Sequence, residues 1–335
     1  MLPLTISGLA SSLPEEVVSS TSLEAELNLP AGWIEQRTGI RERRRATRQS
    51  VLDLAEPAAR LALNRAQRDE SDLGLVVGAS TGRHQFIPCT AALLQRRMGL
   101  PEGRAFAFDV DATCLSFLVG LRVAAQWVAA SGTAESGRPT GSALLFSSEM
   151  SQHSLNPREP ESYVLIGDGA AAAVLEHQPG NGSGMHGAWF TTHASGSEYT
   201  CFLGGGTHHH PNNPSTTREM NLFHMNGPAV FKMALKLVPD FMRRVFSEVG
   251  WKPHEVDAVV PHQASAPGVD LLVSRCGLHR DQIVSNLATR GNCIAASIPI
   301  ALSEAVESGR IRRGDRVLLC GTGAGLSLGA VALTF

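Results

Sequence analysis

Short, largely apolar runs alternate with longer amphipathic segments along the whole chain. The short runs have strand length, whereas the longer segments repeat apolar side chains at helical spacing. Strands are predicted at residues 4–9, 73–78 and 142–146, and helices at residues 20–27, 51–66 and 229–248 and within residues 86–98. Strands and helices that alternate in this way predict an α/β protein with mostly parallel or mixed sheets.

One strand-to-helix passage contains a candidate nucleophile, Cys114. Residues 105–110 are small or apolar and are predicted to form a strand. Residues 115–130 contain no proline, one glycine and one charge, so a buried helix is predicted there. Free N–H groups and the positive end of the helix dipole meet where such a helix begins, and they should stabilise the Cys114 thiolate. The alternative is an ordinary core cysteine.

The second part of the chain repeats features of the first. Residues 254–265 resemble residues 69–80, residues 321–333 resemble residues 167–175, and residues 286–306 repeat the strand-to-helix passage at Cys114. A repeat on this scale predicts two similar α/β halves. We assign residues 1–175 to the N-terminal half and residues 176–335 to the C-terminal half, with the boundary between residues 175 and 215.

Composition and charge narrow the classes of function. The formal net charge is −2 at pH 7, which does not favour nucleic acid or an anionic membrane as the main partner. The six cysteines form no CxxC pair, as is typical of a reducing compartment. We see neither a signal-peptide pattern nor an apolar run of about 18 residues, and therefore expect a soluble cytoplasmic protein.

Two polar stretches require separate interpretation. The basic run at residues 41–45 fits either a phosphate or nucleic-acid patch or an ordinary solvated face, and Glu42 dilutes its charge. His208, His209 and His210 lie in a loop rich in glycine, proline and asparagine. This loop contains no carboxylate that would complete a metal site, so we expect no metal there.

Seven motifs, in order along essentially the whole chain, resemble the β-ketoacyl-acyl carrier protein synthase III family of the thiolase superfamily. They are Trp33-Ile34 with residues 37–41, the Cys114 segment, Gly167-Asp168-Gly169-Ala170, Gly227 with Phe231-Lys232, residues 260–264 around His262, Gly291-Asn292 with residues 295–299, and the glycine-rich end. The resemblance implies a thiolase-like fold, in which two similar α/β halves give a five-layered αβαβα arrangement, and a homodimer.

The resemblance also implies roles for individual residues. Catalysis is expected from Cys114, His262 and Asn292; coenzyme A binding from Trp33, Arg37, Gly227 and Phe231; an oxyanion hole from the backbone of Cys114, Gly323 and Gly325; an acyl pocket from Ile166 and from Ile87 of a partner subunit; and carrier docking from Lys232 and Arg275. Thioesters of coenzyme A or of acyl carrier protein are the expected substrates. Neither a cofactor nor a metal is required.

The residue types suit a decarboxylative Claisen condensation. A cysteine thiolate attacks thioesters and leaves again readily, so Cys114 can hold the first acyl group. When a malonyl thioester then loses CO₂, negative charge develops on its thioester oxygen. The His262 Nε2–H and the Asn292 amide can both donate hydrogen bonds to that oxygen.

The chain departs from the family pattern at several positions. Pro160 and Pro267 stand where the family has further arginines for coenzyme A, although Arg158 is near the first. Losing these cations weakens phosphate contacts and so disfavours tight binding of a coenzyme A donor. Ile87 is smaller than the Phe found in short-chain enzymes. We therefore favour a specialised condensing enzyme, with an acyltransferase that does not decarboxylate, or a non-catalytic carrier-binding protein, as alternatives.

Overall fold

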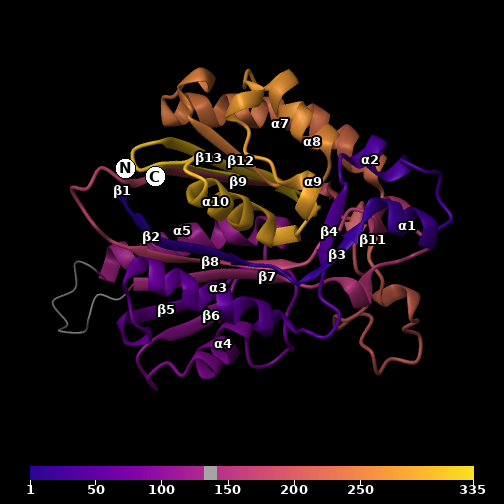
Figure 1. Ribbon diagram of the computed structural model, residues 1–335, viewed down its shortest axis with the longest axis horizontal. Coiled ribbons are helices and arrows are strands. Elements are labelled where there is room, and N and C mark those ends of the chain that lie inside the picture. The colour runs from indigo at the N-terminus through magenta and orange to yellow at the C-terminus, as the bar shows by residue number, and fades with distance from the viewer. Residues whose placement is uncertain (132–141) are drawn as a thin grey trace.

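The computed structural model describes residues 1–131 and 142–335, and its framework is a pair of five-stranded sheets (Figure 1). The N-terminal sheet has the strand order β2-β8-β7-β5-β6. Its strands are β2 (Thr5–Ser12), β5 (Leu73–Gly78), β6 (Phe106–Asp109), β7 (Ser142–Glu149) and β8 (Gly169–Glu176). β5 is parallel to β6 and β7, whereas β8 is antiparallel to β2 and β7, so the sheet is mixed.

The C-terminal sheet has the order β1-β9-β14-β13-β12. Its strands are β1 (Leu2–Pro3), β9 (Gly184–Gly196), β12 (Ala258–Pro261), β13 (Arg316–Gly323) and β14 (Gly325–Thr334). β12 and β13 are parallel, and the other pairs are antiparallel. The chain passes from the first sheet to the second between β8 and β9, but β1 already pairs with β9.

Helices form three layers around the two sheets (Figure 1). α5 (Ser116–Ser131) and α10 (Ser297–Glu307) lie between the sheets and share one core with both. α3 (Val51–Ala66) and α4 (Thr90–Met98) pack on the outer face of the N-terminal sheet. α7 (Gly227–Val249) and α8 (Ala266–Arg275) cover the outer face of the C-terminal sheet. This order of layers confirms the predicted five-layered, thiolase-like architecture.

Short strands and helices lie at one edge of these layers. They are β3 (Glu16–Ser19), β4 (Glu42–Arg45), β10 (Thr200–Cys201), β11 (His224–Met225), α1 (Ser20–Glu26), α2 (Trp33–Thr38), α6 (Pro160–Tyr163) and α9 (Leu287–Arg290). Two 3₁₀ turns, η2 (Thr113–Leu115) and η7 (Ile294–Ala296), lead directly into the central helices α5 and α10.

The basic run at residues 41–45 is not a uniformly solvated face, because one of its cations, Arg43, is buried. Its residues form β4, paired with β3. Arg43 is 2% exposed, and its guanidinium donates hydrogen bonds to the carbonyls of Val164 (2.7 Å) and Val18 (3.4 Å). Burial lowers the pKa of Arg43 to about 10. The cation therefore ties β4 to the segment before β8, because these carbonyls need donors.

The stretch Thr113–Ala130 has the length and hydropathy of a membrane span, and 50% of it is buried inside the molecule. Leu118, Leu121 and Val128 of this stretch belong to the core between the two sheets. The same properties are found in the core helices of soluble proteins, and here packing against both sheets accounts for them.

Candidate active site

Cys114 lies in the η2 turn, between the end of β6 and the start of α5. The Ser116 hydroxyl holds the turn, because it accepts a hydrogen bond from the Ala112 N–H (2.9 Å) and donates one to the Thr113 carbonyl (2.7 Å). Thr113 has a φ of 52°, an uncommon value for a side-chain-bearing residue. The turn directs the Cys114 thiol into a cavity instead of into the core.

His262 follows the last residue of β12, and its N–H donates to the carbonyl of Cys320 (2.7 Å). Gly321 makes room for its side chain, since a Cβ at position 321 would lie 2.6 Å from the His262 Cβ. The imidazole contacts the backbone of Ile294, and its Nδ1 is buried with no hydrogen-bond partner among the described residues. Burial lowers the pKa of His262 to about 4, so the ring is neutral at pH 7.

Asn292 is held by the backbone on both sides. Its N–H donates to the Leu165 carbonyl (2.8 Å), and its carbonyl accepts from the Gly167 N–H (3.0 Å). The side-chain Oδ1 accepts a hydrogen bond from the Ile294 N–H (2.9 Å). This bond fixes the orientation of the amide, so its NH₂ group is the end left to donate to a substrate. Asn292 is 8% exposed and lines the same cavity as Cys114.

Ile294 and the end of β13 bring these three residues together. Ile294 contacts both His262 and Asn292, and it also lines the Cys114 cavity. β13 passes His262 at Gly321 and reaches η2 at Gly323, where a Cβ would lie 2.7 Å from the Thr113 Oγ1. The next residue, Ala324, directs its N–H to the Cys114 thiol. The turns η2 and η7 pack against each other across this point.

The electrostatics at Cys114 differ from the expectation of a stabilised thiolate. Burial and the charge of Glu149 raise the pKa of Cys114 to about 12, although the N–H groups of Cys114 and Ala324 act in the opposite direction. The resting group is therefore a thiol. A nucleophile must be generated by removing its proton, and the neutral imidazole of His262 has a ring-nitrogen lone pair that can accept it.

Glu149 belongs to the site but was not predicted. It ends β7, is 1% exposed, and accepts hydrogen bonds from the N–H groups of Thr81 (2.7 Å) and Gly82 (2.9 Å). It lines the Cys114 cavity, and burial raises its pKa to about 8. The signal in the sequence is an acidic residue that ends an otherwise uncharged, buried run at residues 142–148.

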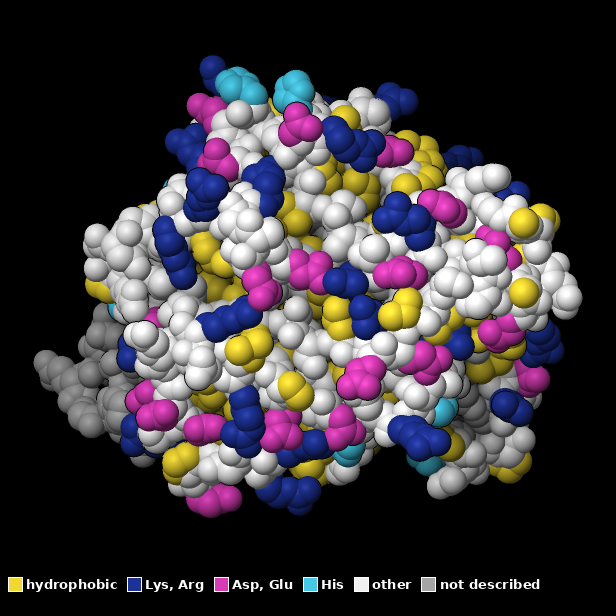
Figure 2. Space-filling model, viewed as in Figure 1, with side chains coloured by type: hydrophobic (Ala, Val, Ile, Leu, Met, Phe, Trp, Pro, Cys, Tyr) yellow, Lys and Arg dark blue, Asp and Glu magenta, His cyan; other side chains and the backbone are white. Residues whose placement is uncertain are grey.

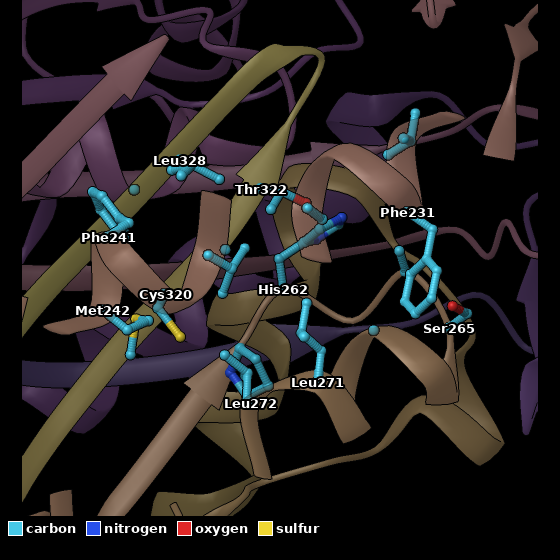
Figure 3. Close-up of a pocket in the computed structure, with 18 of the residues that line it drawn as sticks. Phe231, Phe241, Met242, His262, Ser265, Leu271, Leu272, Cys320, Thr322 and Leu328 are labelled. Atoms are coloured by element: carbon cyan, nitrogen blue, oxygen red, sulfur yellow. The ribbon is translucent and has the colours of Figure 1, made fainter. Parts of the chain in front are cut away.

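The three residues line two cavities. The first, of about 250 Å³, contains Cys114, Glu149, Asn292 and the predicted acyl-pocket residue Ile166. The second, of about 150 Å³, lies on the other side of His262 and contains Gly227 and Phe231, two of the residues predicted to bind coenzyme A (Figure 3). Cys114 and Asn292 thus line one cavity, and His262 lines the other.

The remaining predicted residues lie outside the two cavities. On α2, the Arg37 guanidinium stacks over the Trp33 ring at 4.7 Å from its centroid and lies 3.8 Å from the Glu161 carboxylate. Ile87 is 83% exposed and does not line the Cys114 cavity of its own chain. Lys232, beside Phe231, is exposed near the start of α7.

Two further predictions concern α8 and the loop after β13. Arg275 is exposed at the last residue of α8, three residues beyond Leu272, which lines the cavity. The loop N–H at Cys114 is that of Ala324, which lies between the two predicted glycines, Gly323 and Gly325. One predicted donor is thus the N–H of Cys114 itself, and the second comes from the glycine-rich loop expected to supply it, at Ala324.

Comparisons with known proteins agree along the whole chain. The family models for 3-oxoacyl-[acyl-carrier-protein] synthase III and for its C-terminal part match residues 108–194 and 246–335. The beta-ketoacyl-[acyl-carrier-protein] synthase III of Desulfotalea psychrophila is 34% identical over 337 residues, which cover 98% of each chain.

Solved structures give the same result. The 3-oxoacyl-(acyl carrier protein) synthase III from Pseudomonas aeruginosa PAO1 has a TM-score of 0.87 at 34% identity, covering 99% of this chain and 98% of that one. The priming beta-ketosynthase from the R1128 polyketide biosynthetic pathway has a TM-score of 0.87 at 27% identity, covering 98% and 96% of the two chains.

Proposed function

Because the chain belongs to the 3-oxoacyl-[acyl-carrier-protein] synthase III family, we propose that it is an acyltransferase of the ketosynthase III type. It loads an acyl group onto Cys114 and condenses that group with a malonyl thioester to give a β-ketoacyl product. The observation that carries this proposal is the convergence of Cys114, His262 and Asn292, with the Asn292 amide fixed as a donor.

In the loading step, the Cys114 sulfur attacks the thioester carbonyl while His262 accepts the thiol proton. The donor thiol then leaves and takes this proton from His262. The N–H groups of Cys114 and Ala324 stabilise the oxyanion that forms between these events. A neutral His262 is required at the start, and its low pKa keeps it neutral.

In the condensation step, the bond between the malonyl α-carbon and its carboxylate breaks, CO₂ leaves, and the electron pair becomes an enolate. His262 and Asn292 donate hydrogen bonds to the enolate oxygen. The α-carbon then attacks the acyl-Cys114 carbonyl and forms the new carbon–carbon bond. The bond between this carbonyl and the Cys114 sulfur breaks, so Cys114 leaves as a thiolate and the β-ketoacyl product is released. His262 is neutral and so retains one N–H for this purpose.

The substrates arrive as thioesters of acyl carrier protein or coenzyme A. Trp33 and Arg37 on α2 lie beside α8, at the edge of the His262 cavity. The face seen in Figure 2 carries cations and anions side by side, so docking of an acidic carrier depends on local cations. Lys232 serves this purpose better than Arg275, because it adjoins Phe231 in the cavity wall.

The chain acts as a cytoplasmic homodimer that pairs through the edge strand β6. This strand exposes Phe106 (57%), whose ring stacks on that of Trp127 at 5.9 Å between centroids. Phe86 and Ile87 project from the same half with exposures of 72% and 83%. Exposed aromatic and aliphatic side chains of this size favour a protein partner, and a second copy would place Ile87 at the neighbouring site.

The proposal is tested by intact-mass analysis of the chain after incubation with an acyl thioester, together with CO₂ release from malonyl carrier protein. We expect one acyl adduct, lost in Cys114→Ala and retained in the matched variant Cys201→Ala, because Cys201 lines the same cavity. An adduct in Cys114→Ala would refute the assignment. Acylation of Cys114 without any CO₂ release would instead identify an acyltransferase that does not decarboxylate.

A further inference from the structure

The cavity beside His262 extends well beyond the reacting centre. It lies between the helices α7 and α8 and the C-terminal sheet (Figure 3). Phe231 and Ser265 lie at its outer end, His262 and Thr322 lie midway, and Phe241 and Met242 lie at its inner end. A group that binds at His262 therefore has space on two sides.

The two ends of this cavity differ in chemistry. Polar side chains lie at the outer end and midway, on Ser265, Thr322 and His262. The inner wall is apolar and is made by Val238, Phe241, Met242, Leu271, Leu272 and Leu328. Burial raises the pKa of the adjoining Cys320 to about 12, so this thiol is uncharged. Amides and hydroxyls, such as those of a pantetheine arm, would lose their hydrogen bonds at the inner end, whereas an aliphatic chain would not.

Gly268 lines the cavity on the same helix as Leu271 and Leu272, next to Ser265. It is the third residue of α8, where a glycine weakens the helix. Its backbone does not require a glycine, because its φ lies outside the left-handed region. A Cβ there would have one neighbour within 4 Å among the described residues, the Ser265 Oγ at 3.9 Å. The absence of a side chain therefore leaves space in the cavity beside Ser265.

We propose that the inner part of this cavity binds an aliphatic chain of medium length, carried by one of the thioester substrates, and that Gly268 admits it. The inference rests on the proposed function, since the aliphatic chain is part of a thioester substrate. It assigns this enzyme to substrates with a linear alkyl chain, instead of the smallest acyl groups alone. This alkyl chain belongs either to the primer or to the second thioester.

Binding can be measured without acyl transfer. In Cys114→Ala, calorimetric titration with S-ethyl-, S-hexyl-, S-octyl- and S-decyl-pantetheine should show Kd falling about fourfold per methylene until the cavity is full. Gly268→Leu should abolish this dependence on length, whereas Gly268→Ala should retain it and controls for the gain in helix propensity. Ala234→Ile, which fills the cavity from α7, should reproduce the effect if Gly268→Leu does not fold.

The same length dependence in Gly268→Leu and Ala234→Ile, or none in the parent protein, would overturn the proposal. Two further measurements in the active protein distinguish the source of the chain. A lower ratio of octanoyl to acetyl loading on Cys114 in Gly268→Leu identifies the primer. An unchanged ratio with slower condensation of a long-chain second thioester identifies the second substrate. If no thioester loads any variant, the proposed function fails, but the binding result is still valid.

Discussion

At the scale of the residue, burial at Cys114 opposes the chemistry that the residue would perform. Its pKa of about 12 makes the thiolate rare at pH 7, and the two N–H groups at the sulfur compensate only in part. Loading therefore depends on proton transfer to His262, whose pKa of about 4 leaves it free to accept a proton. Cys114 and His262 are therefore both neutral in the resting enzyme, and they become charged only when the proton is transferred during the reaction.

Glu149 makes this dependence testable through pH. Its charge raises the pKa of Cys114, but its own pKa is about 8, so that charge develops only as the pH rises through this value. Glu149→Gln should therefore lower the pKa of Cys114 and speed its alkylation by iodoacetamide several-fold at about pH 9 to 10, because one pKa unit is about tenfold in thiolate. Below about pH 7 the two rates should converge.

Asp111→Asn is the matched control, since Asp111 raises the pKa of Glu149 but does not act directly on that of Cys114; at about pH 9 to 10, where Glu149 is ionised in either protein, this variant should be alkylated at the parent rate. Equal alkylation profiles for Glu149→Gln and the parent protein would contradict the assigned electrostatics.

Single residues differ in how well the sequence reveals them. Cys114, His262 and Asn292 stand in recognisable motifs, and the structure brings them to one centre. Glu149 could not be found in this way, because a carboxylate at the end of a strand resembles any solvated strand end until its neighbours are known. The glycine-rich loop was expected to supply a donor N–H, but its residue, Ala324, was not identified, since the direction of an N–H depends on a turn that the glycine pattern does not specify.

At the scale of the element, the two turns η2 and η7 contribute to the site through the same backbone conformation. Thr113 and Ile294 both have a φ of 52°, and each begins a 3₁₀ turn that leads into a central helix. The predicted internal repeat therefore extends to the backbone conformation. It brings Cys114 from one half against Asn292 from the other.

β13 sets the spacing between these turns and His262, and Gly321 is its most sensitive position. Gly321→Ala would place a Cβ 2.6 Å from the His262 Cβ and move the imidazole. We expect condensation to fall by about 10²-fold, since small displacements of a reacting group have costs of this size. Steady-state rates with circular dichroism as a check on folding would measure this. Gly206→Ala, where a Cβ meets nothing within 4 Å in the described chain, should keep its activity; equal rates for both variants would refute the steric account.

The bounds of helices and strands with a clear hydrophobic period were predicted closely, whereas elements without such a period were not predicted. The helix at residues 51–66 and the strand at residues 73–78 match α3 and β5. β9 was not predicted, although it has 13 residues. Its residues do not alternate between buried and exposed, because β9 lies between β1 and β14 and is half-exposed over much of its length. Such a strand is determined by partner strands that are distant in sequence, and the local pattern of hydrophobic and polar residues does not reveal these partners.

At the scale of the whole molecule, the alternation of strands and helices predicted the α/β class and the family resemblance predicted the five layers, but the assembly must be tested. Phe106→Glu would place a charge on the exposed edge strand β6. If β6 pairs with a second copy, this variant should become monomeric in light scattering at micromolar concentration and lose activity, because Ile87 could no longer reach a neighbouring site. Leu61→Glu, at 41% exposure on α3, is the matched control and should keep the parent mass. A parent protein that is already monomeric would exclude the dimer.

The central claim is that one centre performs both loading and decarboxylative condensation, with His262 and Asn292 acting on the enolate. The most direct measurement is a single turnover, in which protein already acylated on Cys114 is mixed with malonyl carrier protein and CO₂ and β-ketoacyl product are followed together. We predict equal amounts of both in the parent protein. In Asn292→Ala, acylation should persist while CO₂ release falls by about 10²- to 10³-fold, the usual cost of losing one oxyanion donor. Unchanged CO₂ release in Asn292→Ala and His262→Ala would contradict the account.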